Sequence, residues 1–302
     1  MEMTERPIHV AVLPQEVHEQ SRVAAGEIWV DGTAGAGGHT ADLLRGVLPA
    51  GHVVAIDRDP AACRKLQVRF EQQPVTVIQE SYHRLPLYLE PLAEKLGRPK
   101  PLLVDGILLD LGLSSDQLAD RERGFSFQSD GPLDLRYNPG EGRSAAEWLR
   151  SIDEEELANV IYQYGEERFS RRIARRIVEQ RRIAPIETAK QLADLIHRSV
   201  PGRIHGRVDS ATRTFQALRI AVNRELEIVE EALRELPKTL KPGGRFLVIS
   251  FHSLEDRLVK HAFRDCAELE VLSKKPIVAS ELEMKMNPRS RSAKLRVARR
   301  LG

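Results

Sequence analysis

The residues best suited to chemistry in this chain are four polar side chains, each at or just beyond the end of a short apolar run typical of a buried strand. They are Asp31 after residues 28–30, Asp57 after residues 52–56, Tyr82 after residues 75–78 and Asp110 after residues 105–109. Helical patterns separate these runs, and strands that alternate with helices predict a parallel sheet with right-handed crossovers. Such sheets bind ligands at the carboxyl ends of their strands. We therefore expect the four side chains to surround one binding crevice.

A glycine-rich turn follows the first of these strands, in the sequence EIWVDGTAGAGGHT. Its glycines are Gly32, Gly35, Gly37 and Gly38. They permit positive φ angles and a close approach of the backbone to a ligand, and the helix behind them presents unpaired N–H groups. The dinucleotide fingerprint would need glycine or alanine in place of Thr40, and a P-loop would need lysine in place of Gly38. Both phosphate-binding interpretations are weakened, and the turn is instead typical of S-adenosylmethionine enzymes, whose ligand carries no phosphate.

Asp57 stands about twenty residues beyond the glycines, where a carboxylate can accept hydrogen bonds from both hydroxyls of a ribose. The following helix does not need Asp57 as its cap, because Asp59 and Pro60 already supply an N-cap and a first-turn proline. Tyr82 allows two interpretations, stacking on an adenine ring or a role in the core or rim. Together the strand ends favour a ligand that contains a nucleoside.

Composition sets broad limits on function. The chain has 302 residues, enough for one large domain or two, and a net charge of only +2, so a basic surface for nucleic acid would have to be local. Cys63 and Cys266 show no metal-ligand spacing, which predicts a reducing cytoplasm and no metal site. There is no apolar run of membrane-spanning length and no signal-peptide core, so we expect a cytoplasmic protein with no membrane partner.

The pattern changes after Asp110. Residues 111–142 are dense in Gly, Ser, Asp, Asn and Pro without a sustained period, and so long an irregular segment predicts an active-site loop that opens an insertion. Helical patterns without strands follow, and a capping box of Ser144 and Glu147 begins the first of them. The others are predicted near residues 153–164, 166–182 and 188–197. A basic, glycine-punctuated hinge at 201–208 then returns the chain to the sheet.

The helix predicted over residues 166–182 has a strongly basic face. Phe169, Ile173 and Ile177 define its apolar side, and six arginines fall on an arc of roughly 140° that faces away from them. These are Arg168, Arg171, Arg172, Arg175, Arg176 and Arg182. Because Glu179 lies within the arc, two interpretations stand: a solvated, partly salt-bridged surface, or a face that binds phosphates. The second interpretation predicts that this helical unit recognises RNA.

The end of the chain completes the sheet. The predicted elements are a long amphipathic helix over 212–236, a strand over 245–250 after a KPGG turn, a helix capped by Ser253 and Asp256, and a closing antiparallel hairpin of 271–279 with 293–301. A final hairpin of this kind is typical of the seven-stranded methyltransferase sheet. The helical segment, roughly 114–205, is then an insertion after the fourth strand.

Motifs that are specific when taken together run from one end of the chain to the other: VDGTAGAGGHT, AIDRDP, DGILLDLGLSS, RGFSFQSDGPLDLR, SAAEWL, YGEERF, ATRTFQALRIAVN, PGGR, ISFHSLEDR and NPRSRSAKLR. With them the chain resembles the bacterial 16S ribosomal RNA cytosine-N4 methyltransferase family, also called MraW. The resemblance implies an α/β class I S-adenosylmethionine-dependent methyltransferase with a Rossmann-like seven-stranded sheet and an inserted helical domain. The implied domains are a first part of the core at 1–113, a substrate-recognition insertion at 114–205 and a second part of the core at 206–302.

The resemblance also implies the ligand and the substrate. S-adenosylmethionine is the expected methyl donor, and the expected substrate is the exocyclic N4 amine of a cytidine in the decoding region of 16S rRNA, on the small ribosomal subunit. The family's cofactor-binding positions correspond to Gly37, Gly38, His39, Asp57, Tyr82, Asp110 and Gln117. Tyr82 stands where relatives carry phenylalanine, which keeps the stacking ring. The oligomeric state stays open, with a homodimer as one option.

Methyl transfer to this amine needs assistance because its lone pair is delocalised into the ring. A hydrogen bond to a carboxylate or a backbone carbonyl is the expected means. Asp110 is the nearest candidate for the catalytic residue, although its carboxylate can equally be committed to the cofactor. Ser114 and Ser115 are second candidates, with hydrogen bonds to the loop backbone as their more ordinary role. His252 is either a proton acceptor or, more ordinarily, a packed histidine at a strand end.

Two other classes of protein remain open at this point. A nicotinamide-dependent oxidoreductase could use a similar sheet, but the missing third glycine of the fingerprint argues against it. A non-catalytic ribosome-assembly factor could use the fold only to bind RNA. Binding of a nicotinamide cofactor or of S-adenosylmethionine distinguishes the oxidoreductase from the methyltransferase. A methyl-transfer assay distinguishes the methyltransferase from the non-catalytic assembly factor.

Overall fold

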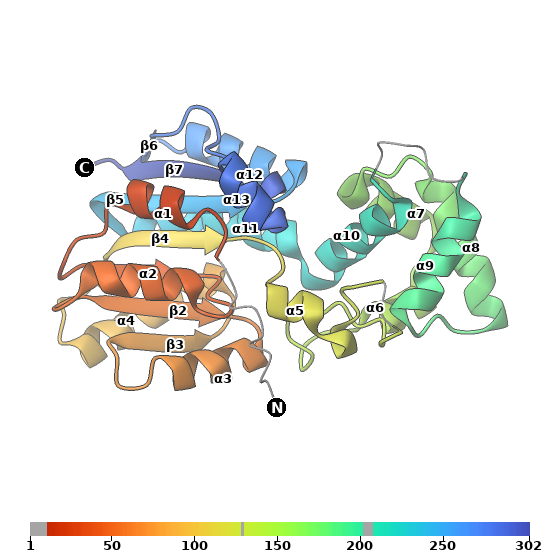
Figure 1. Ribbon diagram of the computed structural model, residues 1–302, viewed down its shortest axis with the longest axis horizontal. Coiled ribbons are helices and arrows are strands. Elements are labelled where there is room, and N and C mark those ends of the chain that lie inside the picture. Colours follow the sequence, from red (N-terminus) through yellow and green to blue (C-terminus); the bar gives the residue numbers. More distant parts are fainter. Residues whose placement is uncertain (1–10, 128–129, 202–207) are drawn as a thin grey trace. The chain divides into compact units, whose positions relative to one another are not determined.

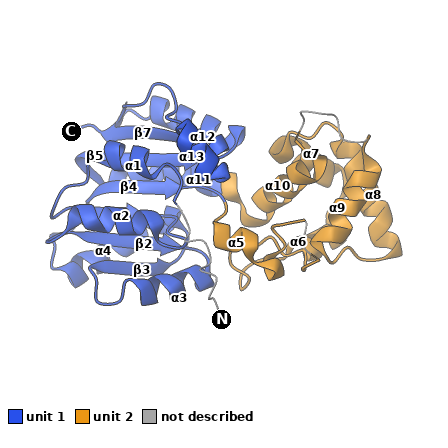
Figure 2. Cartoon of the chain, in the orientation of Figure 1, with its two compact units in different colours: residues 1–112, 227–302 blue, residues 113–226 orange. Residues whose placement is uncertain are grey.

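The computed structural model describes residues 11–127, 130–201 and 208–302. The chain forms two compact units: unit 1 comprises Met1–Gly112 and Glu227–Gly302, and unit 2 comprises Leu113–Leu226 (Figure 2). The return to the core, predicted at residue 206, comes at Glu227 in this division, because the helix that follows the predicted hinge packs with the helices of unit 2. The hinge predicted at 201–208 lies mostly outside the described residues.

Unit 1 is built around a seven-stranded sheet with the strand order β3-β2-β1-β4-β5-β7-β6 (Figure 1). Its strands are β1 (Ile28–Asp31), β2 (His52–Asp57), β3 (Val75–Gln79), β4 (Val104–Asp110), β5 (Leu240–Ser250), β6 (Leu269–Val271) and β7 (Lys294–Arg300). The first five run parallel, and β7 runs antiparallel to both β5 and β6. The predicted open α/β sheet is confirmed, since helices connect its parallel strands.

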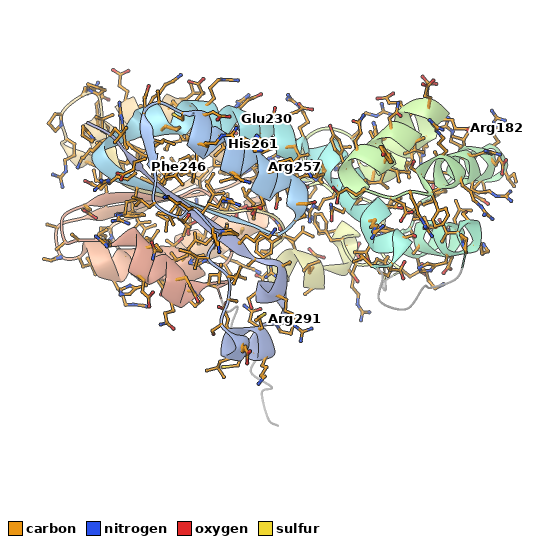
Figure 3. All side chains as sticks on the ribbon, turned by 90° about the horizontal axis from the view of Figure 1, so that it is seen from above. Arg182, Glu230, Phe246, Arg257, His261 and Arg291 are labelled. Atoms are coloured by element: carbon orange, nitrogen blue, oxygen red, sulfur yellow. The ribbon has the colours of Figure 1, made fainter. Side chains whose placement is uncertain are left out.

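Helices cover both faces of the sheet. Along β4, Ile107 and Leu109 belong to one apolar cluster and Leu108 to the other, as the two-residue period of a strand requires. The ring of Phe246 on β5, labelled in Figure 3, lies 5.3 Å from the ring of Phe263 on α12. The helices around this sheet are α1 (Pro14–Ser21), α2 (Gly38–Val47), α3 (Pro60–Arg69), α4 (Pro86–Leu96), α11 (Glu225–Glu235), α12 (Ser253–Asp265) and α13 (Glu281–Met286).

The closing hairpin is only partly as predicted. β6 and β7 pair antiparallel, but β6 ends at Val271. Beyond it, the N–H groups of Leu272 and Ser273 donate to the carbonyl of Val297, and Ile277 forms an isolated bridge with Leu295. Pro276 lies in the segment predicted as strand, and a proline has no N–H to donate to a ladder. The following linker holds α13 and the short 3₁₀ helix η4 (Pro288–Ser292).

Unit 2 is helical. Its helices are α5 (Ser115–Ala119), α6 (Ala145–Ser151), α7 (Glu154–Gly165), α8 (Ser170–Ile183), α9 (Ala189–Ser199) and α10 (Ser210–Asn223), with the 3₁₀ helix η2 (Arg121–Arg123). They enclose an apolar cluster of their own, and the capping box of Ser144 and Glu147 is confirmed at the start of α6. Across the ranges that the structure describes, no helix of either unit combines the length and the apolar character that crossing a membrane would require.

Two predicted helices have different limits in the structure. The helix predicted from residue 166 begins at Ser170, because Glu166 takes a left-handed φ of 49° that ends α7. The single helix predicted over 212–236 is wrong: α10 ends at Asn223, and Arg224 takes a left-handed φ of 54° before α11 begins. The apolar period continues across this break, so the pattern alone does not reveal it.

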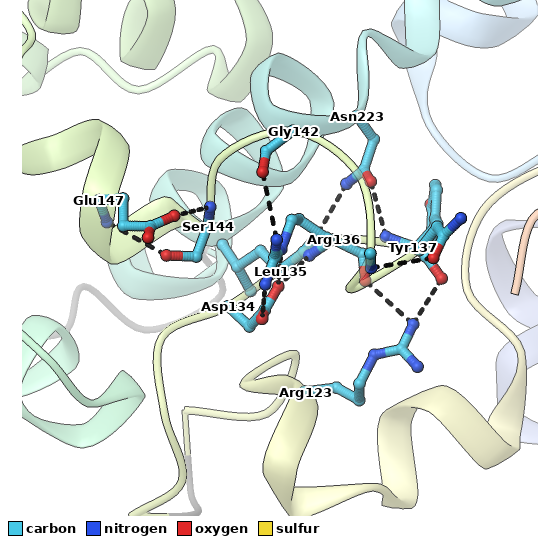
Figure 4. Close-up of polar contacts among 11 residues, drawn as sticks. Arg123, Asp134, Leu135, Arg136, Tyr137, Gly142, Ser144, Glu147 and Asn223 are labelled. Atoms are coloured by element: carbon cyan, nitrogen blue, oxygen red, sulfur yellow. Dashed lines mark hydrogen bonds and ion pairs between the residues drawn. The ribbon is translucent and has the colours of Figure 1, made fainter. Parts of the chain in front are cut away.

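Side-chain hydrogen bonds order the irregular segment after β4 (Figure 4). Asn223 accepts from the N–H of Tyr137 and donates to the carbonyl of Leu135, each at 2.7 Å. Arg123 donates to the carbonyls of Arg136 at 3.0 Å and of Tyr137 at 2.6 Å. Leu135 has a φ of 63°, which is uncommon for a bulky side chain, so these bonds stabilise an otherwise unfavourable turn. Residues 135–137 of the predicted loop are therefore held by contacts from within unit 2.

Candidate active site

The glycine-rich turn between β1 and α2 is fastened to the strands on either side of β1. The N–H of Ala34 donates to the carbonyl of Ile56 on β2 at 3.0 Å. The N–H of Asp110, at the end of β4, donates to the hydroxyl of Thr33 at 2.6 Å. The turn therefore has a fixed position at the carboxyl edge of the sheet, where the sequence predicted the crevice.

Asp57, at the end of β2, is bonded to the same turn. Its Oδ2 accepts from the N–H of Gly35 at 2.7 Å, and its Oδ1 accepts from the N–H of Asp59 at 2.8 Å. The side chain is half-buried, and each carboxylate oxygen can accept more than one hydrogen bond. These backbone bonds orient the carboxylate and leave it able to accept bonds from the hydroxyls of a ribose.

Asp31, at the end of β1, braces the helix behind the turn. The residue is 1% exposed, and its Oδ2 accepts from the hydroxyl of Thr40 at 2.6 Å. Burial raises the pKa of Asp31 to about 6, while the hydrogen bonds from Thr40 and from the N–H of Thr33 oppose this shift. The contact joins the end of β1 to the first turn of α2.

The carboxyl group of Asp110 has few polar contacts among the described residues. Its Oδ2 lies 3.8 Å from Nε2 of His39 on α2, and its Oδ1 is buried without a hydrogen-bond partner in the described part of the chain. Burial raises the pKa of Asp110 to about 7; the Arg289 guanidinium opposes this shift, and Asp31 and Glu255 add to it. A cationic ligand beside Asp110 would therefore favour the ionised carboxylate.

Packing against neighbouring side chains restricts Gly37 and Gly32 of the turn to glycine, which the sequence did not predict. Gly37 has a φ of 82°, and a Cβ there would lie 2.8 Å from the side chains of Leu66 and Phe70. The space beside Gly37 thus belongs to the core. At Gly32 a Cβ would lie 2.9 Å from the Cβ of Tyr82, so Tyr82 packs directly against the turn.

Gln117 is the one predicted cofactor residue that belongs to unit 2; the others, Gly37, Gly38, His39, Asp57, Tyr82 and Asp110, belong to unit 1. Its side-chain oxygen accepts from the N–H of Ser114 at 3.0 Å, and the Ser114 hydroxyl accepts from the N–H of Gln117 at 3.2 Å. Together they form the capping box of α5. Ser114, a second candidate for amine activation, therefore has a structural role.

His252 is the N-cap of α12, in place of the predicted Ser253 and Asp256. Its Nδ1 accepts from the N–H of Glu255 at 3.4 Å, and its Nε2 lies 3.1 Å from the Glu255 carboxylate. Both ring nitrogens face the same residue, so the geometry agrees with a packed strand-end histidine. Asp256 instead accepts from Nε of Arg296 at 2.6 Å.

Sequence reasoning missed three residues at this edge: Thr33, Thr40 and Arg289. Thr33 lies within the glycine turn and Thr40 just after it, and hydroxyl side chains so close to strand-end carboxylates are the signal in the sequence. Arg289 stands in the NPRSRSAKLR motif, but its influence on Asp110 depends on the fold of η4.

The strand order, the glycine turn after β1 and the polar ends of β2 and β4 define a class I S-adenosylmethionine-dependent methyltransferase. The donor set fits that cofactor. S-adenosylmethionine is cationic at its sulfonium and its ammonium groups, and the orphaned oxygen of Asp110 favours a positive charge. Its ribose hydroxyls match the carboxylate of Asp57.

Comparison with known proteins gives the particular family. The model of the MraW methylase family matches residues 6–301, and the chain belongs to this family. Ribosomal RNA small subunit methyltransferase H of Thioalkalivibrio sulfidiphilus is 46% identical, over 98% of each chain. The protein of the same name from Trichlorobacter lovleyi is 45% identical, over 97% of this chain and 98% of its own. A solved rRNA methylase from Streptococcus thermophilus, 12% identical and covering 100% of both chains, has a TM-score of 0.45, too low to carry an argument.

Proposed function

We propose that this protein transfers a methyl group from S-adenosylmethionine to the exocyclic N4 amine of a cytidine in the decoding region of 16S rRNA, within the small ribosomal subunit. The observation that carries the proposal is the whole-length likeness to small subunit rRNA methyltransferases, together with a carboxyl edge fit for the cofactor. The proposed site of action is the cytoplasm. Two cysteines without a disulfide in the described chain agree with that compartment.

The cofactor supplies an electrophilic methyl group when bound. We assign its ribose to Asp57 and its adenine to Tyr82, which packs against the turn. Gly37, Gly38 and His39 at the start of α2 are assigned to the rest of the ligand, and Gln117 stays a prediction from the family resemblance.

Asp110 is proposed as the residue that orients and activates the amine. An ionised carboxylate can accept an N–H of the amine, which turns the nitrogen lone pair out of conjugation with the ring. A carboxyl with a pKa near neutrality can also take the proton that the amine loses after transfer. Nearby His39 and Arg289 are positioned to keep Asp110 in place and partly ionised.

Substrate recognition is proposed for unit 2. The target base must leave its stack before its amine can be reached, and holding an unstacked base needs contacts beyond the cofactor site. A helical unit with its own core and an ordered loop can provide them.

Light scattering of the purified protein distinguishes a monomer from the homodimer that the sequence left open.

The test is methyl transfer from labelled S-adenosylmethionine to small ribosomal subunits that lack this modification, with naked 16S rRNA compared in parallel. Label on the N4 position of one cytidine in the decoding region is the expected result. Stable binding of subunits with no transferred label would instead favour the non-catalytic assembly factor.

A further inference from the structure

Helix α8 of unit 2 concentrates positive charge on its surface. Its 14 residues contain six arginines and one glutamate, a net charge of +5, whereas the whole chain carries +2. Its apolar residues Ile173, Ala174, Ile177 and Val178 are buried in the core of unit 2. The charge therefore lies on the side of the helix that the core leaves uncovered.

The structure sorts these arginines by what they contact. Arg181 donates to the carbonyls of Leu149 and Ile152, each at 2.7 Å, and so fastens α8 to the end of α6. Arg176 lies 2.8 Å from the carboxylate of Glu179. The predicted arc also contains Arg168, which the structure places ahead of the helix.

Four arginines of α8 remain exposed, and none has an ion pair or hydrogen-bond partner in the described ranges: Arg171, Arg172, Arg175 and Arg182. At 100° per residue they occupy an arc of about 100°, and at 1.5 Å per residue they extend over about 16 Å. Arg182 is labelled in Figure 3. The four lie on one side of the helix, together with Glu179, which pairs with Arg176, and we call these four arginines the α8 arginine face.

This arrangement costs stability in the free protein. Arg171 and Arg175 are four residues apart, where like charges repel, and Arg172 and Arg176 repeat the spacing. Arg171 and Arg172 also lie in the first turn, beside the positive end of the helix dipole. Residues that destabilise the folded protein without a compensating contact indicate a functional role.

We propose that the α8 arginine face binds the phosphate backbone of ribosomal RNA outside the target nucleotide. The inference rests on the proposed function, since it assigns part of the substrate to this surface. Guanidinium groups pair with phosphates through two parallel hydrogen bonds, and a polyanion relieves the repulsion between the four side chains. A helix that binds membranes needs an accessible apolar face. The apolar face of α8 is buried and, of its apolar residues, only the terminal Ile183 is exposed, so RNA fits better than a lipid surface.

The test replaces Arg171, Arg172, Arg175 and Arg182 together with glutamine in the full chain. Binding of an unmodified 16S rRNA fragment is measured at several salt concentrations. The variant should bind roughly tenfold more weakly, and the slope of log K against log salt should fall by about 3, as expected for four lost contacts to a single strand. The KM for small subunits should rise with little change in kcat, and the melting temperature at low salt should stay the same or rise.

A charge-matched control removes four arginines that already have carboxylate partners in unit 1: Arg45, Arg234, Arg264 and Arg299. This control should keep the salt slope of the wild type. Arg181→Gln, which removes two carbonyl contacts, should lower the melting temperature and also keep the slope.

Three results would overturn the inference: an unchanged slope in the α8 variant, an equal loss in the charge-matched control, or a loss of binding to anionic phosphatidylserine vesicles without a loss of RNA binding. The proposed function is judged separately, by methyl transfer with the wild-type protein. If the wild type methylates subunits and the α8 variant binds RNA normally, only the inference fails.

Discussion

The carboxyl edge of the unit 1 sheet and the α8 arginine face handle charge in opposite ways. At the sheet edge, Asp31 is buried and Asp110 is half-buried, and burial raises the pKa of each. The four arginines of the α8 arginine face are exposed and carry their charge in solvent. A pre-arranged acidic crevice suits a small cation that can be enclosed, whereas an open row of guanidinium groups suits an extended anion. In the proposed function, one chain thus separates cofactor chemistry from substrate affinity.

Asp110→Asn tests the acidic side of this comparison and should have the largest effect. Asparagine keeps the size of the side chain but cannot take a proton or carry a negative charge. We expect kcat to fall by about 10²- to 10⁴-fold, the range typical of a lost general base. Single-turnover methyl transfer measures the change. A variant with wild-type kcat would remove Asp110 from the catalytic role.

The pH dependence of stability tests whether burial sets the pKa of Asp110. Because its pKa is raised from 3.8 to about 7, the native state holds a proton that the unfolded state has already released between these values. Stability should therefore fall as pH rises through this window, and Asp31 should add to the fall up to about pH 6.

Asp110→Asn removes the contribution of Asp110 to this dependence. Above pH 7 the ligand-free variant should be more stable than the wild type, by roughly 2–4 kcal/mol as an upper range. Urea unfolding at pH 5 and pH 8 measures the difference. Equal stability of the two proteins at pH 8 would contradict the assigned cause.

Asp57→Ala tests the ribose contact. Loss of charge-assisted hydrogen bonds should weaken S-adenosylmethionine binding by about 2–3 kcal/mol in calorimetry. The N–H groups of Gly35 and Asp59 also lose their acceptor, so some stability is lost as well. Asp59→Ala is the matched control: it removes the N-cap bond to Ala61, at a cost of about 1 kcal/mol in stability, and should keep cofactor affinity. Unchanged affinity in a folded Asp57→Ala protein would refute the ribose assignment.

Asn223→Ala tests the ordered loop of unit 2 and should have the smallest effect on the cofactor. The change leaves the N–H of Tyr137 and the carbonyl of Leu135 without their partner and should cost roughly 1–3 kcal/mol of stability. Affinity for S-adenosylmethionine should stay within about twofold of the wild type, because no contact described for Asn223 involves a predicted cofactor residue. A large loss of cofactor affinity would mean that the two units do not divide their tasks as proposed.

The sequence alone determined the sheet and its ligand edge. Strands β1 to β5 appeared as apolar runs, and Asp57 and Asp110 appeared at their ends, because strand periodicity and chain order are local properties. The family followed from motifs along the whole chain. The arginine arc was also visible, since helical spacing depends only on the residues of one segment.

Only the tertiary structure decided which of these groups are already engaged. The break at Arg224, the packing that fills the space beside Gly37, the cap formed by His252, and the carbonyl contacts of Arg181 all depend on residues distant in the chain or on backbone angles. A pattern of residue types carries no information about such partners. Burial decides the charge of Asp110 in the same way, because desolvation by surrounding atoms, and not the residue itself, sets its pKa.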